Sequence, residues 1–120
     1  MSKTVLVVDD SASVRRSVRT ALPGFDIIEA ADGLEAAEII EGRDDVDLVI
    51  CDVNMPRMTG LEMLKRVGPK VSGIDLKVLM LTTEGQPNLI KQARSLGAKG
   101  WVVKPFKPSQ LLAAAKKLTA

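Results

Sequence analysis

Short apolar runs alternate with longer segments of helical periodicity along this chain, and this alternation restricts its fold more than any other feature. The five runs lie at residues 5–8, 25–30, 48–51, 78–81 and 101–103. Most of them are continuously apolar and rich in β-branched residues, as expected of strands that are covered on both faces. The pattern predicts five successive βα units, (βα)5, which build a doubly wound, open parallel sheet in a three-layer α/β sandwich.

The segments between these runs carry apolar residues at every third or fourth position, which is typical of amphipathic helices. We expect helices around residues 14–22, 34–40, 61–67, 89–96 and 111–118. Glycine and proline are expected to end the first four of them, at Pro23–Gly24, Gly42, Gly68–Pro69 and Gly97. The strand at 25–30 mixes polar and apolar residues, so we expect it at an edge of the sheet.

The length and composition are those of one ordinary globular domain. The chain has 120 residues, of which 46% are hydrophobic and 27% charged, and we expect residues 1–120 to form a single domain. Its apolar runs are far shorter than the ~20 residues of a membrane span, and the N-terminus does not resemble a signal peptide. The one cysteine, Cys51, excludes an internal disulfide and fits a reducing compartment. We therefore expect a cytoplasmic protein with no membrane insertion.

The composition also excludes several classes of function. The chain has no histidine, which rules out Ser-His-Asp and Cys-His catalysis, zinc sites that use histidine, and a phosphohistidine on this chain. The net charge is only +2 and aromatic residues make up 2% of the chain. A broad nucleic-acid surface needs more positive charge and more rings for stacking, so no nucleic-acid partner is expected.

Polar residues with complementary chemistry follow four of the five predicted strands. Asp9 and Asp10 follow the first, Asp52 the third, the Thr82–Thr83–Glu84 segment the fourth, and Lys104 the fifth. Because the carboxyl ends of parallel strands share one edge of the sheet, where ligands bind, these groups are expected to meet there. Taken alone, each has an ordinary interpretation as a turn, a helix cap or an exposed loop residue. Their coincidence at one edge favours a common site.

Three carboxylates at one edge need compensating positive charge. One pair of like charges about 4 Å apart costs about 4 kcal/mol at an effective dielectric constant near 20. Lys104 offsets one negative charge, and a hard divalent cation would offset the other two; all-oxygen ligands suit Mg²⁺. A carboxylate nucleophile, a metal, an ammonium and a hydroxyl together suit phosphoryl transfer.

Four segments carry a resemblance to a known family, and together they are specific. They are residues 7–11, 52–56 with Thr59–Gly60, 80–84 and 100–106. Over its whole length the chain resembles the receiver domain of bacterial response regulators, and within that family it looks most like the single-domain chemotaxis CheY proteins. The resemblance implies a flavodoxin-like sheet with strand order 2-1-3-4-5.

The resemblance also implies roles for individual residues. Asp52 would be the phosphoacceptor, taking a phosphoryl group from a CheA-like histidine kinase. Asp9 and Asp10 would bind Mg²⁺ together with Asp52 and the backbone carbonyl of Asn54. Thr82 would donate a hydrogen bond to one phosphoryl oxygen.

Further residues would complete the site and transmit its state. Lys104 would pair with another phosphoryl oxygen, and the Lys104–Pro105 bond would be cis. Asn54 and Glu84 match positions that tune hydrolysis of the aspartyl phosphate. Thr82 and Trp101 would form the switch, in which Trp101 turns inward when Thr82 moves toward the phosphoryl group. The resulting change at the fourth helix and fifth strand would be read by a target protein.

Several functions remain open at this point. The first is a monomeric phosphorylation switch, a signalling protein rather than an enzyme, that acts on a flagellar motor switch protein in chemotaxis. The second is a phosphorelay intermediate that passes phosphate to a histidine phosphotransferase. A Mg²⁺-dependent aspartyl-phosphate phosphatase is disfavoured because the candidate nucleophile follows the third strand, and a flavin module because Asp9 and Asp10 would repel its phosphate. Three arginines on the first helix, Arg15, Arg16 and Arg19, form either a solvated face or a kinase-docking surface.

Overall fold

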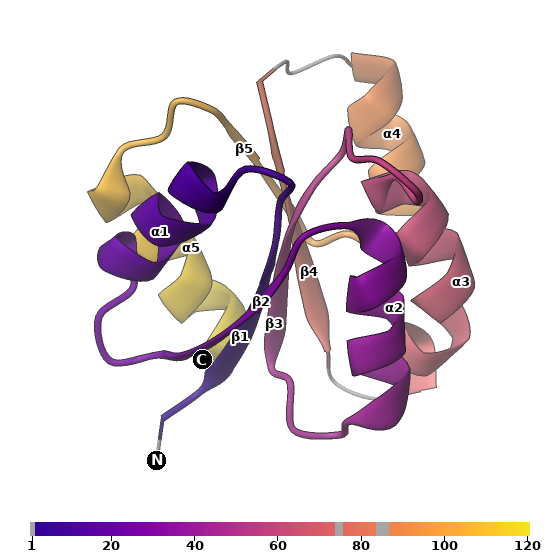
Figure 1. Cartoon of the computed structure of the whole chain (residues 1–120), viewed down its shortest axis with the longest axis horizontal. Coiled ribbons are helices and arrows are strands. Elements are labelled where there is room, and N and C mark those ends of the chain that lie inside the picture. The colour runs from indigo at the N-terminus through magenta and orange to yellow at the C-terminus, as the bar shows by residue number, and fades with distance from the viewer. Residues whose placement is uncertain (1, 74–75, 84–86) are drawn as a thin grey trace.

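The computed structural model describes residues 2–73, 76–83 and 87–120, and these contain five strands and five helices in strict alternation (Figure 1). The strands are β1 (Thr4–Val8), β2 (Asp26–Ala30), β3 (Leu48–Asp52), β4 (Lys77–Thr82) and β5 (Gly100–Val103). The helices are α1 (Ala12–Ala21), α2 (Gly33–Gly42), α3 (Gly60–Gly73), α4 (Pro87–Ser95) and α5 (Pro108–Thr119). Among the described residues, no helix is both long and apolar enough to cross a membrane.

The strands form one parallel sheet in the order β2-β1-β3-β4-β5. This confirms the predicted doubly wound fold, and it confirms the edge position of the more polar second strand. Helices α1 and α5 cover one face of the sheet and α2, α3 and α4 cover the other (Figure 1). The carboxyl ends of all five strands consequently point to the same edge.

The core consists of two apolar layers, one on each face of the sheet. Within β1, Val5 and Val7 pack toward α1 and α5, whereas Leu6 and Val8 pack toward α2 and α3. Both layers are fully buried, which explains why the central strands are continuously apolar instead of alternating. Cys51 lies in the second layer with none of its surface exposed, and burial raises the pKa of its thiol. It is therefore a packing residue rather than a reactive one.

Several element ends differ from the predictions by one or more residues, and three of these differences concern the residues expected to mark the ends. The strand β2 begins at Asp26 rather than Phe25, and Gly42 is the last residue of α2 rather than a residue beyond it. Helix α3 continues through Gly68–Pro69 to Gly73. A proline also disfavours the helical conformation of the residue before it, through a clash with the amide and the Cβ of that residue. Gly68 has no Cβ, which removes part of this clash, and the helix continues past the pair.

Two glycines allow chain segments near the carboxyl edge to approach each other closely. A Cβ at Gly60 would overlap the carbonyl oxygen of Asp52, and a Cβ at Gly33 would lie 2.5 Å from the carbonyl oxygen of Met58. The Gly60 amide donates a hydrogen bond to the carbonyl of Val53 at 2.9 Å. The start of α3 therefore packs directly on the end of β3.

We predict that Gly60→Ala lowers the free energy of unfolding by about 1–3 kcal/mol, as other overpacked sites do. The overlap is with backbone, which cannot move without displacing the end of β3. Gly42→Ala is the matched control, because open space surrounds Gly42 in its helix and alanine favours helices. Urea unfolding of both variants tests this, and equal stability of the two would contradict it.

Candidate functional site

The register of the central strands places Asp9 and Asp52 side by side. Val8 of β1 pairs with Cys51 of β3, and each aspartate follows one residue later. Neighbouring strands are about 4.8 Å apart, so side chains at these two positions meet. The Asp9 amide also donates a hydrogen bond to the carbonyl of Ala30 at 3.1 Å, which continues the sheet on the other side.

Asp9, Asp10 and Asp52 form one acidic cluster. A carboxylate oxygen of each residue lies within 4.8 Å of the others. Asp9 and Asp52 are buried, with 1% and 7% of their surface exposed, whereas Asp10 is exposed. The cluster thus combines two buried carboxylates with a third at the surface.

Lys104, which follows the edge strand β5, brings a positive charge into this cluster. Thr82 of β4 pairs with Val103 of β5, and the next residue, Lys104, donates its amide to the carbonyl of Thr82 at 2.6 Å. Its Nζ lies 3.1 Å from Oδ2 of Asp9 and 3.4 Å from Oδ2 of Asp52. The Lys104–Pro105 bond is cis, as the resemblance implied.

The electrostatics show that negative charge is in excess. Burial raises the pKa of Asp52, the Asp9 charge raises it further, and Lys104 only partly reverses this. For Lys104, burial opposes the ammonium, but the hydrogen bond and charge of Asp9, together with the charge of Asp52, raise its pKa overall. One ammonium shared between two buried carboxylates leaves the site short of positive charge.

The donor set fits a magnesium ion. Three carboxylates lie within reach of one ion, and hard oxygen donors are the ligands that Mg²⁺ takes. Burial and the Asp9 charge raise the pKa of Asp52, so a cation bound beside it would favour its ionised form. Asp9, Asp10 and Asp52 are the side chains that would hold it.

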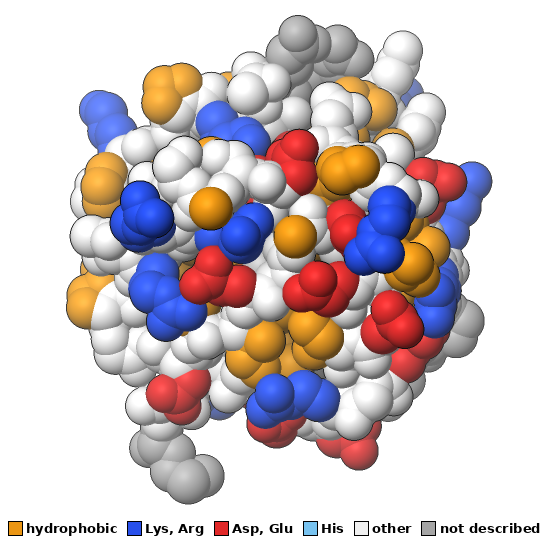
Figure 2. Space-filling view, viewed as in Figure 1, with side chains coloured by type: hydrophobic (Ala, Val, Ile, Leu, Met, Phe, Trp, Pro, Cys, Tyr) orange, Lys and Arg blue, Asp and Glu red, His pale blue; other side chains and the backbone are white. Residues whose placement is uncertain are grey.

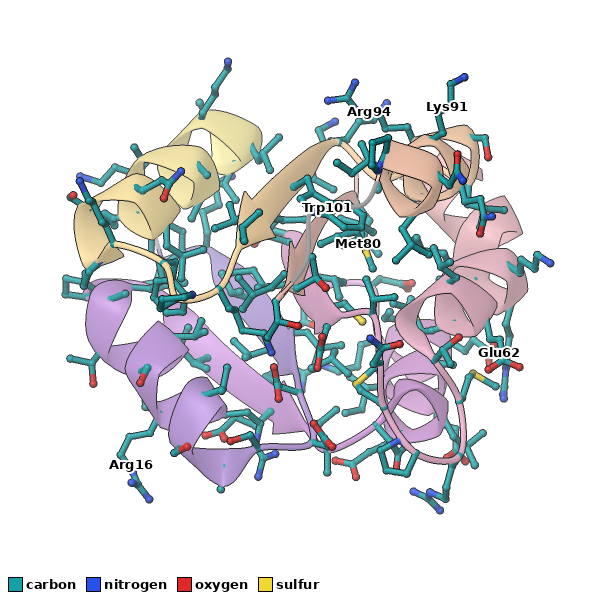
Figure 3. All side chains as sticks on the ribbon, turned by 90° about the horizontal axis from the view of Figure 1, so that it is seen from above. Arg16, Glu62, Met80, Lys91, Arg94 and Trp101 are labelled. Carbon is teal, nitrogen blue, oxygen red and sulfur yellow. The ribbon has the colours of Figure 1, made fainter. Side chains whose placement is uncertain are left out.

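The remaining predicted site residues differ in their burial and in their position relative to the cluster. Thr82 ends β4 next to Asp52 and is 1% exposed, while Asn54 is exposed in the loop after β3. Trp101 packs against the apolar layer on the α3 and α4 side, beside Met80 (Figure 3), and its Nε1 is buried without a hydrogen-bond partner among the described residues. Glu84 lies outside the described residues.

Sequence reasoning missed the groups that orient Asp9. Its Oδ1 accepts a hydrogen bond from the amide of Ser11 at 2.9 Å. Arg15 donates from Nη1 to the Asp9 carbonyl at 2.5 Å and from Nε to Glu29 at 2.9 Å. Arg19 pairs with the same glutamate, so two of the three helix arginines are structural and only Arg16 projects freely (Figure 3). No local sequence signal marks an arginine that binds a backbone carbonyl.

A groove of about 650 Å³ also opens beside Lys104. Helix α1 forms one wall, including Val14 and Arg16, and the β5–α5 connection with Phe106 forms the other. Its walls are largely apolar, and Lys104, which contacts Asp9 and Asp52, is one of its lining residues. Sequence analysis did not predict this groove, whose two walls are some 90 residues apart along the chain.

Comparison with known proteins identifies the class of protein that this fold and site define. Residues 5–116 match the response regulator receiver domain family. The chain belongs to this family, which confirms the resemblance seen in the sequence. Receiver domains are the receiving modules of two-component signalling, and they bind Mg²⁺ at an aspartate cluster such as the one described above.

Individual relatives narrow the class to CheY-like proteins. A chemotaxis protein CheY homologue of Campylobacter jejuni is 38% identical over 110 residues, which are 89% of this chain and 85% of that protein. The structure of Vibrio cholerae CheY4 is 40% identical with a TM-score of 0.89, covering 98% of this chain and 99% of that one. A CheX–CheY complex with BeF3 and Mg²⁺ from Borrelia burgdorferi contains a chain that is 30% identical, with a TM-score of 0.90 and coverage of 98% and 90%.

We predict that Asp52→Asn stabilises the metal-free protein at pH 7 by a few degrees in melting temperature. An unfolded aspartate has a pKa of about 3.9. Because the folded pKa of Asp52 is raised, its contribution to stability is complete below that value and is lost as the pH rises through the folded pKa. The advantage of the variant should therefore disappear in acid.

This effect is measured by thermal unfolding in EDTA at pH values from about 3.5 to about 8, a range that includes the titration of carboxyl groups. Asp10→Asn is the control, because Asp10 is exposed and solvent already screens its charge. A wild-type protein at least as stable as Asp52→Asn at pH 7 would show that Asp52 is adequately compensated without a metal.

Proposed function

We propose that this receiver domain is a phospho-aspartate switch in which Asp52 accepts a phosphoryl group from a histidine kinase. The observation that carries the proposal is the convergence of three carboxylates within 4.8 Å of one another with the Lys104 ammonium 3.4 Å from Asp52. In the proposed site, Asp9, Asp10, Asp52 and the backbone carbonyl of Asn54 hold Mg²⁺.

In the transfer step, a carboxylate oxygen of Asp52 bonds to phosphorus while the bond from phosphorus to the donor histidine nitrogen breaks. The nitrogen leaves with the electron pair and takes its proton from solvent. The attack needs ionised Asp52, a form that Lys104 favours. Lys104 then pairs with a phosphoryl oxygen and the Thr82 hydroxyl donates to another. Mg²⁺ held by these residues would supply neutralisation of the negative charge in the transfer step.

The output of the switch is proposed to run through β5 and α4. Movement of Thr82 toward the phosphoryl group would vacate space that Trp101 fills, and the indole already lies partly within the core with its Nε1 unpaired among the described residues. An unpaired buried donor is costly, so a rotation of Trp101 that gave its Nε1 a partner would be favourable. Asn54 and Glu84 are proposed to tune the lifetime of the phosphate.

The proposed target-binding face lies on the outside of α4 and β5. Lys91 and Arg94 project outward from α4 (Figure 3), and Val103 of β5 is an exposed large hydrophobic residue, with 45% of its surface accessible. This combination suits a target segment with both acidic and apolar side chains. Similarity to chemotaxis CheY proteins supports a flagellar motor switch protein as that target.

The kinase is proposed to dock in the groove beside Lys104. The groove offers apolar walls and the exposed Arg16, and it is lined by Lys104, which contacts Asp52. We propose a monomer that acts in the cytoplasm and that has no activity on free phosphate esters. The face seen in Figure 2 carries interspersed acidic and basic side chains rather than one extended charged patch.

We predict that a small-molecule phosphodonor with Mg²⁺ adds one phosphoryl group to the wild-type chain and none to Asp52→Asn, measured by intact mass. Asp45→Asn is the control, because this exposed aspartate pairs with Arg43 away from the cluster. Phosphorylation of Asp52→Asn to the wild-type extent would assign the acceptor elsewhere. Steady turnover of a free phosphate ester would instead favour a phosphatase.

We predict that the fluorescence of Trp101, the sole tryptophan, changes when BeF3⁻ and Mg²⁺ are added together. The same addition to Asp52→Asn should leave the emission unchanged, because the mimic has no carboxylate to bind. Binding without any change in emission would remove Trp101 from the switch. Pull-downs with and without the mimic then distinguish a motor switch target from a histidine phosphotransferase, the recipient expected of a phosphorelay.

A further inference from the structure

The loop between β3 and α3, residues 53–59, lies directly on the turn that leads into α2. The Gly33 amide donates a hydrogen bond to the Met58 carbonyl at 3.1 Å, and the two turns are too close to admit a Cβ at Gly33. The same loop carries Asn54, whose backbone carbonyl is a proposed Mg²⁺ ligand and lies beyond the end of β3. The position of that carbonyl therefore depends on what holds the loop.

Asp32 and Arg57 join the two turns through their side chains. Oδ1 of Asp32 accepts the Glu35 amide at 2.9 Å and so caps α2. Oδ2 accepts from Nε and Nη2 of Arg57, both at 2.7 Å. Asp32 is 5% exposed, so both of its oxygens are committed in a buried position. The Arg57 side chain is itself 58% exposed, so the pair joins a buried carboxylate to a guanidinium at the surface of the loop.

The backbone of Arg57 is in a conformation that arginine rarely adopts. Its φ is +65°, in the left-handed region, and it is the one non-glycine residue with positive φ among those described. Such a conformation is unfavourable for a residue with a Cβ and persists only where the surroundings impose it. The contact with Asp32 is an interaction that a glycine or asparagine at this position could not make.

We propose that the Asp32–Arg57 pair, the loop latch, is a positioning device that fixes the Asn54 carbonyl before the metal arrives and so sets the Mg²⁺ affinity. The inference rests on the proposed Mg²⁺ site. Residues 55–56 alone separate the latch from Asn54, and the Gly60–Val53 hydrogen bond fixes the other end of the loop. A loop held in its binding conformation has no ordering cost when the ion binds. Neither latch residue is a ligand; both act through the backbone.

The latch predicts a change in Mg²⁺ affinity in the opposite direction to the one expected from charge alone. Arg57→Gly and Arg57→Asn both remove a positive charge near a cation site, which by charge alone would tighten Mg²⁺ binding. Loss of the latch should instead weaken it, by roughly tenfold, as loss of supporting contacts around a metal site does. Both substitutes accept positive φ readily, so the fold is expected to survive.

Titration calorimetry with Mg²⁺ alone measures the dissociation constant of each variant. Arg43→Ala is the matched control: it removes a similar guanidinium–carboxylate pair, with Asp45, ahead of β3 at the opposite end of the sheet. Its dissociation constant should stay within about twofold of wild type or fall, as weak surface pairs predict. Arg57→Lys keeps the positive charge but lacks the two guanidinium donors, Nε and Nη2. Its Mg²⁺ dissociation constant should lie between that of wild type and those of the other two Arg57 variants.

Amide hydrogen exchange in the metal-free protein is the second measurement. The Gly33 amide should exchange faster in Arg57→Gly and Arg57→Asn, because its acceptor lies in the released loop. Unchanged or tighter Mg²⁺ binding in these variants, with normal binding by wild type, would overturn the latch and leave the Mg²⁺ site intact. Failure of the wild-type chain to bind Mg²⁺ would overturn both.

Discussion

The arrangement of this receiver domain depends on the compensation of buried negative charge at one edge of its sheet. Asp9 and Asp52 are adjacent because the β1–β3 register places them so, and both are almost fully buried. Lys104 contacts both carboxylates but supplies a single charge. The site therefore remains attractive to a divalent cation and, through it, to a phosphoryl group.

The segments on the two faces of the sheet support this edge in different ways. On one side, α1 places the Ser11 amide and Arg15 against Asp9 and orients it. On the other side, close backbone contacts at Gly33 and Gly60 seat the β3–α3 loop on the sheet. The sheet fixes the reacting carboxylates, whereas the loops around it fix the groups that assist them. In the proposed loop latch, residues that are not ligands would set the affinity of the site for Mg²⁺.

The proposed switch has a structural connection to β5. Thr82 ends β4, Lys104 follows β5, and the two residues share a backbone hydrogen bond. Trp101 lies three residues before Lys104, and its buried indole nitrogen has no hydrogen-bond partner among the described residues. In the proposed function, this is the side chain that would respond to a movement of Thr82.

Most of the fold and the membership of the acidic cluster followed from the sequence. Continuous apolar runs define buried parallel strands, and parallel strands bring their carboxyl ends to one edge, so Asp9, Asp52 and Lys104 could be placed together without coordinates. Helix ends were less predictable: whether Gly68–Pro69 ends α3 depends on a local clash that glycine avoids. The Asp32–Arg57 contact was not predictable, because it joins two turns 25 residues apart.

By itself, the sequence determined which chemistry is available and at which edge it gathers, because the period of apolar residues dictates strands, helices and their covered faces. Only the tertiary structure decided distances and environments: that Lys104 is shared between two carboxylates, that Asp52 is buried enough for its pKa to rise, and that a loop arginine takes a left-handed backbone. These properties arise from packing between segments distant in the chain, and no local pattern of residues encodes them.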